Sequence, residues 1–174
     1  MLAQRLIMTL AERDRSKMIY WAAMEPTDSE DRSRIEKHVE DRAGWGFETV
    51  ECPRSVTNAL SKLEGEVSVL FDSITALTAN EMFGTASEGY LDFPDAGAQS
   101  RVVCELDALS ARAKHTVFVC DNVFCDGESF DEWTENYCRA LAGACRKLAE
   151  NCDVVCEVVC GVAKPYKGEL PPID

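Results

Sequence analysis

The chain has 174 residues, a length typical of one globular domain that can bury a core without disulfides or a structural metal. Its formal charge of −13 argues against a nucleic-acid-binding protein, because a phosphate backbone attracts a basic surface. No apolar run approaches the roughly 20 residues that a membrane-spanning helix needs, so we expect no membrane insertion.

Apolar periodicity divides the first part of the chain into alternating helices and strands. Leucines recur at helical spacing near the N-terminus, and an apolar strand pattern follows a polar break. Residues 27–29 offer N-caps for a highly charged helix. The predicted elements are a helix over residues 2–13, a strand over 18–23, a helix from about 27 to 41, a strand over 45–51, a helix over 55–62 and a buried strand over 67–71.

The same alternation continues to the C-terminus. The predicted elements are a helix over residues 74–83, a long loop over 84–97, a helix over 99–113, a strand over 116–120, a helix over 129–150, a last strand over 154–160 and a Pro-rich tail from Lys164. Strands that alternate with helices predict a single α/β domain over residues 1–174, with a mostly parallel sheet covered by helices on both faces. Ligands of such sheets lie at the carboxyl ends of the strands.

The nine cysteines form no C-x-x-C pair, and only two histidines could complete a zinc site with them. Cys120, Cys156 and Cys160 lie in valine-rich strand candidates, where a thiol behaves as a small apolar residue. We therefore expect reduced core cysteines in a cytoplasmic protein. A redox or metal protein that uses these thiols is the least favoured alternative.

Two tracts carry residues suited to phosphate chemistry. Arg34, His38 and Arg42 follow one another at spacings of four, so on a helix the imidazole lies between two guanidinium groups. The tract 68–75 is an apolar strand that runs into Asp72, the usual position of a carboxylate that faces hydrated magnesium. Together the two tracts indicate nucleotidyl transfer.

Simpler interpretations of these residues stay open. His38 could be a solvated histidine on a charged helix, and Asp72 could cap the helix that follows its strand. The other histidine, His115, opens a strand candidate without a partner pattern, so we expect a structural role for it.

The order of these motifs resembles the bifunctional adenosylcobinamide kinase and adenosylcobinamide-phosphate guanylyltransferase family of cobalamin biosynthesis. The resemblance extends from about Leu2 to Lys167. Its most specific part is the pattern R-I-x-x-H-x-x-x-R-x-x-W, met here as Arg34, Ile35, His38, Arg42 and Trp45, with Thr49 and Glu51 in step behind it.

The resemblance implies a three-layer fold like that of P-loop NTPases of the RecA type and a covalent mechanism. His38 would be the catalytic nucleophile that takes GMP from GTP before (adenosyl)cobinamide phosphate accepts it. GTP and ATP would be substrates, Mg²⁺ the cofactor with Asp72 as its ligand, and a homotrimer the assembly. The nucleotide-binding positions implied are Ala22, Ala23, Met24, Arg34, Arg42, Glu51 and Asp72.

The sequence departs from the family pattern in two places. The first strand and its G-x-x-x-x-G-K-[ST] loop do not precede the first helix, so we expect a lost N-terminal segment and a gap or exposed edges in the sheet. The second is that Asp121–Phe124, Ala140 and Cys145 differ from the residues typical of the kinase half. The alternative function is a non-catalytic nucleotide-binding or assembly relative.

Overall fold

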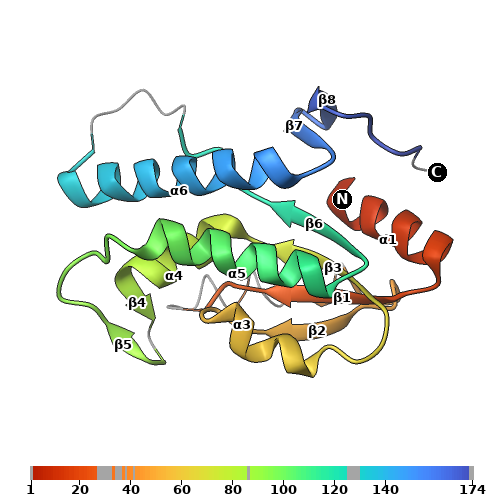
Figure 1. Cartoon of the computed structure of the whole chain (residues 1–174), viewed down its shortest axis with the longest axis horizontal. Coiled ribbons are helices and arrows are strands. Elements are labelled where there is room, and N and C mark those ends of the chain that lie inside the picture. Colours follow the sequence, from red (N-terminus) through yellow and green to blue (C-terminus); the bar gives the residue numbers. More distant parts are fainter. Residues whose placement is uncertain are drawn as a thin grey trace.

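A computed structural model describes residues 2–26, 33, 37, 39–40, 42–85, 87–124 and 130–172 (Figure 1). The helices are α1 (Leu2–Asp14), α3 (Val56–Ala59), the 3-10 helix η1 (Leu60–Lys62), α4 (Ile74–Phe83), α5 (Ala98–Arg112) and α6 (Glu132–Asn151). The strands are β1 (Lys17–Ala22), β2 (Glu48–Glu51), β3 (Val67–Asp72), β4 (Gly84–Thr85), β5 (Gly89–Tyr90), β6 (His115–Val119), β7 (Val155–Val159) and β8 (Val162–Lys167). Of the helix expected over 27–41, the described residues Ser33, Lys37, Val39 and Glu40 are helical.

The central sheet has the strand order β2-β1-β3-β6, and every neighbouring pair in it is parallel. This confirms the predicted α/β fold with a mostly parallel sheet. Of the two predicted alternatives, a gap or exposed edges, the gap is wrong, because β3 pairs directly with β6 from Ser68 opposite His115 to Asp72 opposite Val119. The hydrogen-bond ladder is therefore continuous across the four strands.

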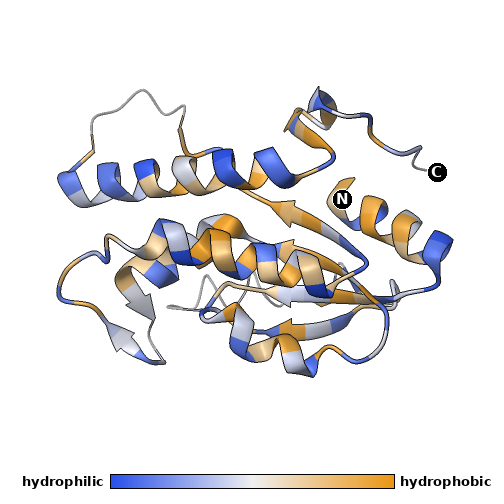
Figure 2. Ribbon diagram, in the orientation of Figure 1, coloured by the Kyte–Doolittle hydropathy of each residue, from blue (hydrophilic) through white to orange (hydrophobic). Residues whose placement is uncertain are grey.

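Helices cover both faces of this sheet (Figure 1). On one face Trp21 and Phe71 are fully buried in a core shared with α3, α4, α5 and α6. On the other face Ile7 of α1 packs on Tyr20 and Leu70. The faces alternate along each strand because successive side chains of a strand point in opposite directions. Figure 2 shows the resulting apolar centre, with hydrophilic residues on the outer side of α6.

The structure contains two short antiparallel hairpins that differ from the predicted elements. The expected last strand is β7, but it lies outside the central sheet and pairs with β8, which the sequence analysis assigned to a tail. Cys160 and Gly161, both at positive φ, form the two-residue turn that favours a tight hairpin. The expected loop over 84–97 contains a second hairpin, β4–β5.

The structure also places His115 and the cysteines. His115 Nε2 pairs with the Asp14 carboxylate, in agreement with a structural role. The eight described cysteines are free thiols, but Cys120 and Cys160 are exposed, so the prediction that they lie in the core is wrong. In the described part of the chain, no three metal-ligating side chains gather in one place. The described helices include none with the length and hydropathy needed to cross a membrane.

Candidate nucleotide site at the carboxyl edge of the sheet

Three of the predicted site residues lie in one row across the carboxyl edge of the sheet. Ala22, the last residue of β1, pairs with Glu51 at the end of β2 and with Asp72 at the end of β3. The main chain continues this ladder, since Ala23 N–H donates to the Asp72 carbonyl (2.9 Å). The side chain of Glu51 is exposed and that of Asp72 is half-buried. Parallel strands thus bring together residues that are up to 50 positions apart in the sequence.

The segment that follows β1 is held in place by α4. Ala23 is fully buried and Met24 is half-buried. Asn80 Nδ2 of α4 donates to the Ala23 carbonyl (2.8 Å) and to the Pro53 carbonyl (2.9 Å). One amide therefore fixes the two chain segments that leave β1 and β2. Asn80 is not recognisable in the sequence as a site residue, because nothing local to it indicates a contact 57 residues away.

Asp72 has a buried phenol as its partner. The Tyr20 hydroxyl donates to Asp72 Oδ2 (2.5 Å). Burial, and next the hydrogen bond to Asp72, raises the pKa of Tyr20, so the phenol stays protonated and donates. This bond holds one oxygen of the carboxylate, Oδ2, in a fixed position. In the predicted strand over 18–23, Tyr20 looks like one more apolar residue. The signal that could have identified it is that a buried tyrosine usually needs a partner for its hydroxyl.

Arg42 joins this group over the face of the Tyr20 ring. Its guanidinium carbon lies 3.4 Å from the ring centre of Tyr20, in a cation–π contact. Arg42 is 7% exposed, and its Nη1 is buried without a hydrogen-bond partner among the described residues. Such a guanidinium nitrogen can donate a hydrogen bond to an anionic group of a ligand.

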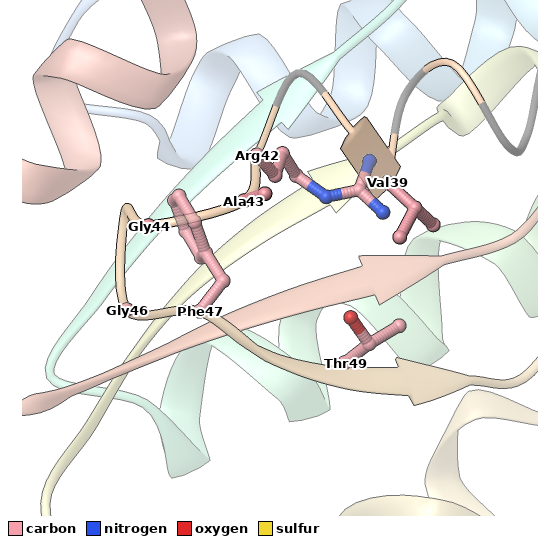
Figure 3. Close-up of a pocket in the computed structure, with 7 residues that line it drawn as sticks. All are labelled: Val39, Arg42, Ala43, Gly44, Gly46, Phe47 and Thr49. Carbon is pink, nitrogen blue, oxygen red and sulfur yellow. The ribbon is translucent and has the colours of Figure 1, made fainter.

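A pocket opens beside Arg42 (Figure 3). Its volume of about 460 Å³ is in the range of small-molecule sites. Figure 3 shows the Arg42 side chain extending toward Val39, with Phe47 and Thr49 on the β2 side. The lining residues are Val39, Arg42, Ala43, Gly44, Gly46, Phe47 and Thr49.

Two predicted residues, Arg34 and His38, lie outside the described residues. Arg42, the second arginine of the pattern, is described and buried.

A buried ionic cluster holds the chain segment that follows β2. Glu81 of α4 is 2% exposed, accepts from Arg101 Nε (2.9 Å) and faces Arg54 (3.7 Å). It also accepts the backbone N–H of Ser55 (3.0 Å), next to the turn that enters α3. Two cations and an amide satisfy this carboxylate, so its role is to hold the chain after β2 in place.

This architecture is that of an α/β nucleotide-binding domain, with polar groups gathered where parallel strands end. A comparison with known protein families matches residues 2–165 to the family described as cobinamide kinase / cobinamide phosphate guanyltransferase. Since the match covers nearly the whole chain, the protein belongs to this family of transferases of cobalamin biosynthesis. The resemblance inferred from the sequence motifs is confirmed. A search of curated proteins finds no match.

Proposed function

We propose that this chain transfers guanylate from GTP to (adenosyl)cobinamide phosphate through a covalent intermediate on His38. The observation that supports this most is the row of Ala22, Glu51 and Asp72, with the buried Arg42 joined to it through Tyr20. His38 precedes Arg42 by four residues, one helical turn in the predicted helix.

The proposed reaction has two displacement steps. In the first, a neutral His38 nitrogen attacks the α-phosphorus of GTP, a P–N bond forms, and the P–O bond to pyrophosphate breaks. In the second, a phosphate oxygen of the cobinamide phosphate attacks the same phosphorus and the P–N bond breaks. Arg34 and Arg42 would stabilise the negative charge that gathers on the phosphoryl oxygens.

Asp72 suits a magnesium site that substrate and water complete. Mg²⁺ in nucleotide sites is typically held by one or two carboxylates, substrate phosphates and waters. The hydrogen bond from Tyr20 engages Oδ2 of Asp72, so Oδ1 is the oxygen that would bind the ion. When bound, the ion would neutralise charge on the pyrophosphate that leaves.

The family also leads us to propose phosphorylation of (adenosyl)cobinamide, with ATP or GTP as donor, in the same domain. A homo-oligomer, a trimer by resemblance, is part of this proposal, and light scattering on the purified chain measures it. A non-catalytic nucleotide-binding or assembly relative is the rival function. It would bind nucleotide without taking a covalent label.

The decisive experiment is incubation with GTP labelled at the α-phosphate and magnesium. We expect a protein-bound label that is acid-labile and base-stable, as in a phosphoramidate. The label should vanish in His38→Ala. His115→Gln is the matched control, because His115 is the other histidine of the chain, opens β6 and pairs with Asp14 at the end of α1. A label that persists in His38→Ala, or no label in any form of the protein, refutes the covalent mechanism.

A further inference from the structure

Two cysteines that the proposed guanylyl transfer does not use have their sulfurs in contact. Cys120 directly follows β6 at the carboxyl edge of the sheet, and Cys145 lies on α6. Their Sγ atoms are 3.5 Å apart, within hydrogen-bonding distance for thiols. A disulfide needs the sulfurs at about 2.05 Å, so the two sulfurs would have to approach each other by about 1.5 Å.

The surroundings of Cys120 favour its thiolate. Thr75, in the first turn of α4, places its hydroxyl 3.8 Å from the Cys120 sulfur as a donor. The same hydroxyl accepts the N–H of Asp121 (2.9 Å), which orients it. Hydrogen bonds from Cys145 and Thr75 lower the pKa of Cys120 to about 7, whereas the bond to Cys120 and burial raise the pKa of Cys145. The Thr75 hydroxyl donates to Cys120, so Cys120 is the sulfur better placed to attack as a thiolate, and Cys145 is placed to resolve it.

Solvent can reach this pair. Cys120 is exposed and Cys145 is half-buried, and both line a groove of about 640 Å³ between α6 and β6. Tyr137 of α6 donates its hydroxyl to the Thr75 carbonyl (3.1 Å), so α6 is already tied to the start of α4 beside the thiols. This anchor keeps the two sulfurs at short range.

We propose that Cys120 and Cys145 form a peroxide-reactive thiol pair that closes to a reversible disulfide. The Cys120 thiolate attacks one oxygen of a peroxide, the O–O bond breaks, and Cys120 becomes a sulfenic acid while hydroxide leaves as water. Cys145 then loses its proton and attacks the sulfenic sulfur, forming the S–S bond and releasing a second water. Overall, two thiols are oxidised to a disulfide and one hydrogen peroxide is reduced to two waters.

The disulfide would link α6 covalently to the end of β6, next to the segment Asp72–Thr75. It would also remove the hydrogen bond between the two thiols. The proposal is independent of guanylyl transfer, because the modification is read on the protein itself.

Peptide mapping of the whole chain tests the pair. The reduced protein is treated with a small excess of hydrogen peroxide, alkylated, and digested with trypsin without reduction. Cleavage after Arg139 and Arg146 releases residues 140–146, in which Cys145 is the sole cysteine. We expect this peptide joined to residues 115–139, with fragmentation placing the bond at Cys120 rather than Cys125 or Cys138.

Single substitutions separate the two roles. Cys120→Ser should abolish the crosslink, and Cys145→Ser should leave a Cys120 sulfenic acid that dimedone traps. Cys104→Ser is the matched control, since Cys104 is an exposed thiol on α5, and it should crosslink like the unsubstituted chain. A crosslink that survives in Cys120→Ser, or peptide 140–146 left unlinked after oxidation of the unsubstituted chain, overturns the proposal. The map of the unsubstituted chain gives this answer even where a variant fails to fold.

Discussion

The centre of the sheet and the C-terminal β7–β8 hairpin are built from similar valine-rich segments but have opposite surroundings. Phe71 of β3 is fully buried, whereas Val159 of β7 is 55% exposed. The β3 ladder joins strands that are distant in sequence, and the hairpin pairs neighbouring segments across a two-residue turn. A strand pattern in the sequence therefore says little about stability or function. Stability depends on the elements that pack on the strand, and function depends on the residues at its end.

The largest difference should appear on removing a large apolar side chain from each region. Phe71→Ala removes a ring packed against Trp21 and Phe118 and should lower the free energy of unfolding by about 3–5 kcal/mol. Val159→Ala, on the exposed hairpin, should stay within about 0.5 kcal/mol. Urea denaturation followed by circular dichroism measures both. Equal losses would mean that the hairpin is covered in solution by another surface.

The second comparison is between a carboxylate of the central sheet and a carboxylate of the hairpin. We expect their substitutions to differ in their effect on function rather than on stability. Asp72→Asn should reduce guanylylation by roughly 100-fold or more, a magnitude typical of lost charge stabilisation, and should weaken Mn²⁺ binding measured by electron paramagnetic resonance. Glu157→Gln, a carboxylate of β7, should change neither. Full guanylylation by Asp72→Asn would show that this carboxylate serves only as the hydrogen-bond partner of Tyr20.

How far the sequence predicts the structure also differs between the two regions. The strands over 18–23 and 67–71 were predictable because each is apolar along its length, and the start of α4 because Ser73 accepts the Ala76 N–H as an N-cap. The strand β8 was missed because Lys164 and Pro165 look like a tail, although an exposed two-stranded ribbon tolerates both.

The same reasoning applies to the candidate site. Ala22, Glu51 and Asp72 were predictable as neighbours because each lies at or beside the end of a predicted strand, and parallel strands align their carboxyl ends. Tyr20 and Asn80 were not, because their partners lie 52 to 57 residues away and only the packed sheet brings them close. The residues next to Tyr20 and Asn80 in the sequence do not indicate these partners.

Two tyrosine–carboxylate hydrogen bonds provide the third comparison. Tyr20→Phe removes the 2.5 Å bond to Asp72 in a partly buried setting and should cost about 2 kcal/mol of unfolding free energy. Tyr166→Phe removes the exposed 2.8 Å bond to Glu157 and should cost about 0.5 kcal/mol or less. If Tyr20 also orients Asp72 for magnesium, only Tyr20→Phe should weaken Mn²⁺ binding. Unchanged Mn²⁺ affinity in that variant would limit Tyr20 to a packing role.

The smallest effect is expected at the turn of the hairpin. Gly161 has a φ of 80°, and no heavy atom lies within 4 Å of the place where a Cβ would be added, so Gly161→Ala meets backbone strain without a clash. That strain is about 1 kcal/mol and acts on a hairpin that can open by itself. Hydrogen exchange should therefore speed up at the β7 and β8 amides while the amides of β1 and β3 keep their protection. Faster exchange in the central sheet as well would show that the two regions unfold as one unit, because strain confined to the turn could then reach β3 only through global opening.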